Sequence, residues 1–160
     1  MFRPLHIIFL LLLLMPLFAC TSSNEHLKSS CISGNARSCI TLCYIKSNEG
    51  EYSEAETLCK HACNHLKDMQ GCSDLGTIKF KEGKSLEALA LCEQACEGGL
   101  AQGCYNRALL GMKSGEGVDS IIKYLIKACD DNLADACKDL SLACDRGNKE
   151  ACKNLLQKKK

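Results

Sequence analysis

Residues 95–104 read ACEGGLAQGC, with two cysteines separated by seven residues and a glycine three residues after the first cysteine. Four further cysteine pairs have this spacing or one residue more: 31/39, 63/72, 129/137 and 144/152. In four of the five pairs the residue three after the first cysteine tolerates the left-handed conformation that ends helices: Gly34, Gly99, Asn132 and Gly147. The pattern therefore places the first cysteine of a pair in the last turn of one helix and the second in the first turn of the next.

A chain reversal between two such helices brings paired cysteines within disulfide distance. We expect five junction bridges: Cys31–Cys39, Cys63–Cys72, Cys96–Cys104, Cys129–Cys137 and Cys144–Cys152. Closing so short a loop stabilises a junction by roughly 2 to 3 kcal/mol on the loop-entropy model. The chain has 14 cysteines in 160 residues, which is typical of secreted proteins held by disulfides in an oxidising compartment.

The second regularity is a repeat of about 33 residues. Placing Cys39 on Cys72 aligns two units without a gap, and apolar residues within a unit recur every three or four residues. Each unit therefore reads as a pair of helices. The three predicted pairs are about 36–47 with 52–65, 70–82 with 85–97, and 101–114 with 117–130. A short helix near 134–144 and a capping helix to about 157 follow them. One hairpin cannot bury its own apolar face, so the units should stack into an all-α solenoid. The predicted units are at about 31–63, 63–96, 96–129 and a shortened 129–157.

Three cysteines remain outside the junction pairs. Cys43 and Cys59 lie on the two helices of the first unit, where an antiparallel hairpin brings them together, so we expect a sixth bridge between them. The position that would pair with Cys92 is Gly76. Cys92 is therefore either a buried free thiol or a handle for intermolecular pairing, and a thiol-redox role would require it to be reactive in the folded protein.

The first 19 residues read as an export signal, because an apolar run from Ile7 to Ala19 is too short to span a membrane. Residues 17–20, LFAC, resemble the lipobox of bacterial lipoproteins, which implies cleavage before Cys20 and lipidation of its thiol. Ordinary cleavage after Ala19 is the alternative and would leave Cys20 as a free thiol. Residues 20–30 are polar and without an apolar period, which predicts a flexible tether.

The repeat resembles a known family. An Ala-Cys pair closing the second helix, Gly or Asn three residues later, and the opening Cys72-Ser73-Asp74-Leu75-Gly76 are similar to the Sel-1-like repeat, a relative of the tetratricopeptide repeat, in its disulfide-bridged bacterial Hcp-type form. The resemblance covers residues 31–157 and implies a right-handed α–α superhelix of disulfide-bridged hairpins. The units are shorter than the usual 36 residues, and Leu-Gly is replaced elsewhere, for example by Leu42-Cys43.

The resemblance also raises a β-lactamase or penicillin-binding activity, because family members are often described in this way. Ser120-Ile121-Ile122-Lys123 matches Ser-x-x-Lys, and Lys113-Ser114-Gly115 imitates Lys-Thr-Gly. The two elements stand in reverse order on a helical hairpin, and a chain with this many Ser and Lys residues carries roughly one such match by chance. The sequence therefore assigns no catalytic residue, and hydrolysis of β-lactams is kept as the alternative function.

The run from Cys59 to His65 (CKHACNH) resembles a metal site only in composition. On an α-helix Cys59 and Cys63 share a face from which His61 and His65 point away, so the four ligands cannot converge. His61 and His65 alone could form a weak surface site, but exposed histidines are the simpler interpretation. We expect neither a metal nor a cofactor.

We expect an exported, lipid-anchored envelope protein that acts as an interaction scaffold or adaptor. The chain's formal charge of +1 and its few aromatic residues argue against nucleic acid as a partner. Solenoids of helical hairpins bind peptides or proteins on a concave face lined by their first helices, and we expect a monomer that binds an envelope or secreted protein. The residues expected on that face are Tyr44, Lys46, Thr77, Lys79, Tyr105, Asn106 and the Leu109 region. The resemblance to lipoproteins implies the outer membrane or periplasm, or secretion if Cys20 is not lipidated.

Overall fold

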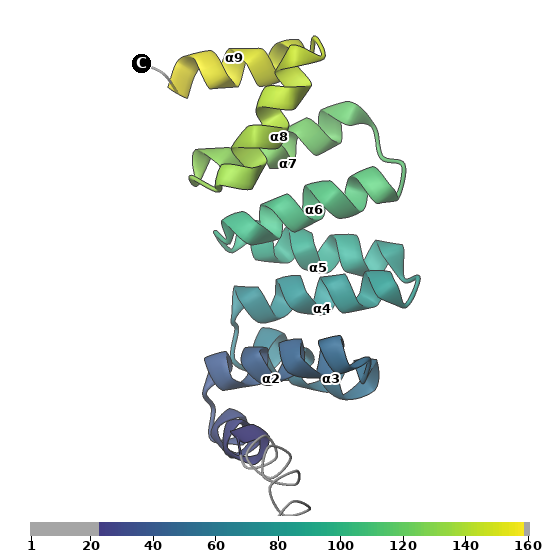
Figure 1. The fold of residues 1–160 in the computed structure, drawn as a ribbon, viewed down its shortest axis with the longest axis vertical. Coiled ribbons are helices and arrows are strands. Elements are labelled where there is room, and N and C mark those ends of the chain that lie inside the picture. Colours follow the sequence, from purple (N-terminus) through teal and green to yellow (C-terminus); the bar gives the residue numbers. More distant parts are fainter. Residues whose placement is uncertain (1–22, 159–160) are drawn as a thin grey trace, which may run out of the picture.

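The computed structural model describes residues 23–158, which are helical and turn residues without a strand. The helices follow one another along an elongated stack, and Figure 1 shows their order. A helical segment at 23–32 precedes α2 (Ala36–Glu49), α3 (Tyr52–Lys60), the π-helix η1 (His61–His65), α4 (Met69–Lys81), α5 (Ser85–Glu97), α6 (Ala101–Lys113), α7 (Val118–Asp130), α8 (Ala134–Asp145) and α9 (Lys149–Lys158). The predicted all-α solenoid is confirmed.

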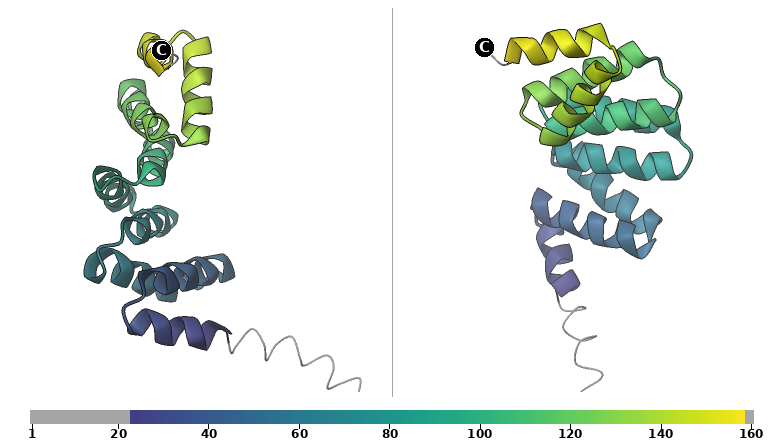
Figure 2. Two further views of the ribbon diagram at one scale, coloured as in Figure 1. Left: turned by 90° about the vertical axis from the view of Figure 1, so that its left-hand side faces the viewer. Right: turned by 45° about the horizontal axis from the view of Figure 1, so that its top comes forward.

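The helices pair into four hairpins that pack in sequence. Each first helix contacts the second helix of its own hairpin, and α2 contacts α4 while α4 contacts α6. The left view of Figure 2 shows the central helices nearly end-on in two rows. The first helices of units one to three therefore form a continuous row, on which side chains from three units can meet.

The unit junctions are packed unusually tightly, and small residues make this possible. A Cβ atom added to Gly71 would lie 2.6 Å from the Cβ of Ala62, and one added to Gly103 would lie 2.6 Å from the Cβ of Ala95. Each of these glycines directly precedes the second cysteine of a junction pair. The close approach brings the paired cysteines to Cα–Cα distances of 4.5 Å and 4.3 Å, at the short end of the range of ordinary disulfides.

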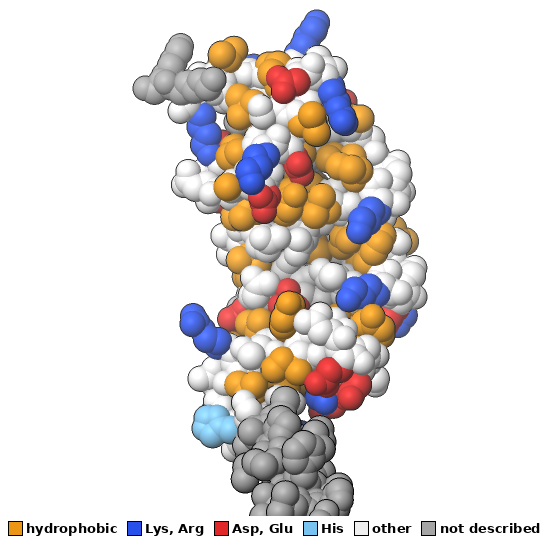
Figure 3. All heavy atoms as spheres, in the orientation of Figure 1, with side chains coloured by type: hydrophobic (Ala, Val, Ile, Leu, Met, Phe, Trp, Pro, Cys, Tyr) orange, Lys and Arg blue, Asp and Glu red, His pale blue; other side chains and the backbone are white. Residues whose placement is uncertain are grey.

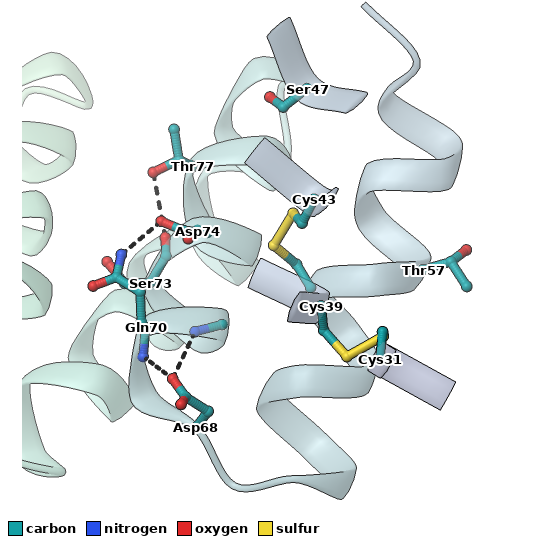
Figure 4. Close-up of a disulfide and its surroundings, with 12 residues drawn as sticks. Cys31, Cys39, Cys43, Ser47, Thr57, Asp68, Gln70, Ser73, Asp74 and Thr77 are labelled. Atoms are coloured by element: carbon teal, nitrogen blue, oxygen red, sulfur yellow. Dashed lines mark hydrogen bonds between the residues drawn. A yellow bond between two sulfur atoms is a disulfide. The ribbon is translucent and has the colours of Figure 1, made fainter. Parts of the chain in front are cut away.

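Residues 23–158 contain six disulfides, and they pair the cysteines as the sequence predicts: Cys31–Cys39, Cys43–Cys59, Cys63–Cys72, Cys96–Cys104, Cys129–Cys137 and Cys144–Cys152. Figure 4 shows Cys31 bridged to Cys39, with Cys43 one turn further along α2. These bridges place the described chain in an oxidising environment, in keeping with export. Within residues 23–158 no helix combines the length and hydropathy needed to cross a bilayer.

Cys92 is the one unbridged cysteine among residues 23–158, and it is fully buried. A Cβ atom at Gly76 would lie 2.7 Å from its sulfur, so the absent side chain of Gly76 is what gives the thiol room. Burial raises the pKa of Cys92 to about 12. The thiol is therefore protonated at neutral pH and shielded from reagents, which agrees with the buried-thiol interpretation and argues against a redox role.

Two local differences from the predicted helices stand out. Residues 23–32 are helical although the sequence predicts a tether as far as residue 30, and the disulfide of Cys31 fastens the end of this helix to α2. The predicted helix 52–65 changes at Lys60 into the π-helix η1, followed by Lys67 at φ 55°. The junction 63–72 is one residue longer than the others, and the wider π-turn with the left-handed Lys67 accommodates that residue.

The predicted signal peptide, residues 1–19, and the lipidation site Cys20 lie outside the described residues.

Candidate docking face

A groove crosses the row of first helices, and it is the principal candidate site. Its volume is about 550 Å³, and we call it the first-helix groove. It is lined by side chains from three consecutive units: Ile40, Thr41 and Tyr44 from α2, Gln70 and Asp74 from α4, and Gln102 and Asn106 from α6. Because the units repeat, Thr41, Asp74 and Asn106 all stand two residues after the second cysteine of their junction pairs.

Hydrogen bonds between successive first helices form a series of rungs beside this groove. Asn106 Nδ2 donates to Ser73 Oγ at 2.9 Å, joining α6 to α4. Tyr105 OH donates to Asp139 Oδ2 at 2.9 Å, joining α6 to α8. In both rungs the first residue directly follows the second cysteine of its junction pair. Its partner belongs to the next unit and stands two positions after the second cysteine of that unit's junction pair. Each rung fixes the register of two neighbouring units.

The first rung, between α2 and α4, is incomplete. Its positions hold Ile40 and Asp74, and an isoleucine side chain cannot donate a hydrogen bond. Asp74 Oδ1 instead accepts from Gln70 Nε2 of its own helix at 2.9 Å. Figure 4 shows Gln70, Asp74 and Thr77 along α4. Asp74 is half-buried, and this desolvation raises the pKa of its carboxyl group.

The groove carries a single formal charge. Asp74 is the only charged residue among those that line it, and it forms no ion pair within the described chain. Tyr44 also lines the groove and is 66% exposed, so it offers a free aromatic surface. The amide side chains, the one carboxylate and the exposed ring suit the binding of a chain that carries a polar or cationic group.

A second groove, which we call the C-terminal groove, is apolar and has a volume of about 730 Å³. It lies between α6, α7 and α8, and its exposed apolar side chains are Met112, Val118 and Leu142. Leu109 and Leu142, which also line it, occupy the register position that Tyr44 occupies in the first unit. Figure 3 shows hydrophobic side chains over this part of the molecule, interrupted by single charges. The two grooves therefore share a register position on the first helices, and the C-terminal groove extends from there onto α7.

The structure brings some of the expected face residues together and separates others. Tyr44 and Asn106 line the first-helix groove, and the Leu109 region lines the C-terminal groove. Thr77 and Tyr105 lie beside them, with Thr77 Oγ1 donating to the Ser73 carbonyl at 3.3 Å and Tyr105 engaged in a rung.

The expectation for Lys46 and Lys79 is corrected by the structure, because both side chains leave the face for ion pairs between helices. Lys46 Nζ lies 2.9 Å from a Glu51 carboxylate oxygen, and the hydrogen bond to Glu51 raises the pKa of Lys46. Lys79 is 7% exposed and pairs with Glu56 of α3. Each lysine follows a face residue by two positions, about 200° around the helix, so it points towards the second helices.

The third unit replaces this lysine with a different cation. Gly111 stands at the lysine position, and the guanidinium of Arg107 occupies the space, where Nη1 lies 2.9 Å from Glu116 Oε2. The carbon of the guanidinium also lies 4.6 Å from the centroid of the Tyr124 ring. Arg107 therefore ties α6 to the loop before α7 and to α7 itself.

Sequence reasoning missed five of the groove residues: Ile40, Thr41, Gln70, Asp74 and Gln102. Asp74 and Asn106 share one register position, two residues after a junction cysteine, while Gln70 and Gln102 share another, two residues before it. Aligning the units on their junction cysteines, with Asn106 as the starting point, would have marked Asp74 and Thr41. The signal was therefore present in the repeat.

The catalytic candidates are engaged with different partners. Ser120 Oγ donates to Glu116 Oε2 at 3.1 Å, as part of the Arg107 ion-pair cluster. Lys123 Nζ lies 5.4 Å from the centroid of the Tyr124 ring, and Lys113 Nζ lies 5.9 Å from that of Phe80. A nucleophile and its base must lie within hydrogen-bond reach of each other, and these contacts do not provide that arrangement.

The histidines of the CKHACNH run lie next to each other, with ring centroids of His61 and His65 5.2 Å apart. His61 also approaches the sulfurs of Cys31 and Cys39. Those sulfurs are joined in a disulfide, whereas a cysteine metal ligand is a thiolate. This cluster therefore lacks the donor set of a metal centre.

No protein-family model matches the chain, and a search of curated proteins finds no match. The resemblance to Sel-1-like repeats therefore stays a prediction from the sequence.

Proposed function

We propose that the protein is an exported scaffold of the Sel-1-like type that binds an extended peptide or partner protein along its first helices. The observation that carries the proposal is a groove lined mainly by polar residues and a groove lined mainly by apolar residues, which share a register position on the first helices between α2 and α8. A surface with separate polar and apolar parts can select a ligand by charge and by buried area at once. The disulfides and rungs hold the units in fixed register, which lowers the entropy lost on binding.

We further propose that the chain is a lipoprotein anchored through Cys20, with the solenoid in the periplasm or at the outer membrane. The lipobox-like LFAC at residues 17–20 and the disulfide-rich solenoid that follows support this placement. Metabolic labelling with a radioactive fatty acid tests it. The full-length protein should incorporate label, and Cys20→Ser should not. Equal labelling of both proteins, or of neither, would count against lipidation of Cys20.

Crosslinking in intact cells tests the docking role. The tagged protein is recovered from the envelope fraction, and the species covalently attached to it are identified by mass spectrometry. The groove variant Tyr44→Ala together with Asn106→Ala should lose the attached species. The control variant Glu97→Ala changes an exposed residue on α5 that lines neither groove and should retain it. An attached species that both variants retain equally would exclude the first-helix groove as its binding site.

A further inference from the structure

The incomplete first rung indicates what the first-helix groove binds. The second rung pairs Ser73 with Asn106 and the third pairs Tyr105 with Asp139, so each polar group finds its partner within the chain. At the first rung Asp74 faces a position occupied by Ile40. One carboxylate oxygen accepts from Gln70, and within the described chain no donor is found for the other, Oδ2.

We infer that the first-helix groove binds a cationic side chain, a lysine or arginine, carried by a peptide segment of the partner, with Asp74 as its carboxylate contact. This inference rests on the proposed docking function and specifies the chemistry of its ligand. A cation supplies the donor that the first rung lacks and offsets the desolvation of the carboxylate. The other possible ligand classes suit the groove less well, because an anion would meet an unpaired carboxylate and an apolar chain would bury it uncompensated.

The rest of the groove lining fits a cation as well. The amide nitrogen of Gln70 donates to the Asp74 carboxylate, which can only accept when ionised, so the Gln70 carbonyl oxygen is free to accept from a ligand. Tyr44 presents an exposed ring within the same groove, where a lysine or arginine can lie over its face. The lining therefore provides a carboxylate, a carbonyl oxygen and a π-surface, and all three attract a positive charge.

The inference is tested by titrating the oxidised, ¹⁵N-labelled full-length protein with four capped pentapeptides that differ only at the central residue of an alanine host. The central residue is lysine, arginine, glutamine or glutamate. The lysine and arginine peptides should shift the amide resonances of residues 70–77 and 102–106, and the glutamine and glutamate peptides should bind about tenfold more weakly or worse.

Three variants locate the effect. Asp74→Asn removes the charge at almost constant shape and should weaken the lysine peptide by about tenfold. Ile40→Tyr keeps the charge but builds the donor seen in the Tyr105–Asp139 rung, so it should also weaken this peptide. Asp131→Asn makes the same charge change at an exposed position outside both grooves and should leave binding unchanged.

The outcomes separate this inference from the docking function itself. If all four peptides change the amide chemical shifts of the groove residues equally, and Asp74→Asn does not alter these changes, the cation assignment is overturned while peptide docking stays in place. Shifts lost equally in Asp74→Asn and Asp131→Asn would reduce the effect to net charge and overturn the assignment to Asp74. If no peptide shifts any groove amide at millimolar concentration, both the assignment and docking in this groove fail.

Discussion

Replacing Gly76 by cysteine should create a further disulfide, between α4 and α5. Gly76 and Cys92 occupy in the second unit the positions that Cys43 and Cys59 occupy in the first, where the Cα atoms of the bridged pair are 5.6 Å apart. A Cβ atom built at Gly76 lies 2.7 Å from the sulfur of Cys92, so the introduced thiol starts within bonding range. The same Cβ lies 3.0 Å from the carbonyl oxygen of Ala88, which must move slightly.

The gain follows from the loop that the new bridge closes. Positions 76 and 92 are 16 residues apart, the same separation as in the Cys43–Cys59 bridge, and no existing disulfide subdivides this segment. The loop-entropy relation gives about 3 kcal/mol for a loop of this length. A side chain at Gly76 also raises helix propensity by about 0.5 to 1 kcal/mol but crowds Ala88 at a cost of about 1 to 3 kcal/mol. Gly76→Ala shares both of these smaller effects, and its methyl group also crowds the Cys92 sulfur, so the difference between the two variants is at least the contribution of the bridge.

Urea unfolding of the oxidised variants, followed by circular dichroism, measures the bridge as the difference between Gly76→Cys and Gly76→Ala. We expect Gly76→Cys to be the more stable by about 3 kcal/mol, with Cys92 no longer alkylated after denaturation without reductant. A bridged variant that gains less than about 1 kcal/mol over Gly76→Ala would refute the loop argument. A thiol that stays unbridged would refute the equivalence of the two units at these positions.

Three further predictions concern single side chains. Burial raises the pKa of Cys92 to about 12, so its thiol should react with iodoacetamide at pH 8 only as fast as the protein unfolds. Peptide mass spectrometry measures the rate of alkylation, and rapid labelling of the folded protein would contradict the burial of Cys92. Arg107→Ala should lower the free energy of unfolding by about 3 kcal/mol, whereas Arg107→Leu should lose only about 1 kcal/mol, because leucine fills this register position in the other units. Asp74→Asn should raise the free energy of unfolding at pH 7 but not at pH 3, as measured by urea titration at both pH values.

The sign of the last prediction follows from proton linkage. Burial raises the pKa of Asp74, so the folded chain binds this proton more tightly than the unfolded chain does. The free energy of unfolding of the wild type therefore falls as the pH rises from the ordinary carboxyl pKa through the higher folded-state value. Asparagine does not titrate and removes this fall, while at pH 3 the carboxyl group is protonated in both states. A variant less stable than the wild type at pH 7 would show that the ionised carboxylate is already compensated within the chain.

The sequence predicted the helical frame because the features that determine it are local and repeated. A junction needs a residue that tolerates positive φ, and Gly99 and Asn132 adopt φ values of 86° and 66° at the helix ends marked by their cysteines. Helix boundaries were consequently predicted to within about two residues, apart from the π-helix at 61–65 and the helical segment at 23–32, which was predicted as a tether as far as residue 30. That π-helix depends on one additional residue in the 63–72 junction, whose effect on hydrogen bonding has no simple signature in sequence.

The candidate site was less predictable because it depends on contacts between units. Lys46 and Lys79 lie on the expected helices, but their long side chains point to glutamates on the opposite side, and Glu56 comes from the preceding hairpin. The rungs likewise join residues 33 or 34 positions apart, as in Asn106 with Ser73 and Tyr105 with Asp139. Such contacts become visible only when the stacking distance between first helices is known.

The rungs also bear on where selectivity resides in the solenoid. Where Ser73 meets Asn106 and Tyr105 meets Asp139, the polar groups satisfy one another, so those positions stiffen the stack and contribute little to a ligand. Asp74 is the exception, since burial raises the pKa of its carboxyl group and its register partner, Ile40, offers no hydrogen-bond donor. A ligand that binds this carboxylate in the folded protein offsets part of that cost. The first two units should therefore determine which ligand is accepted, while the apolar C-terminal groove contributes buried area to its affinity.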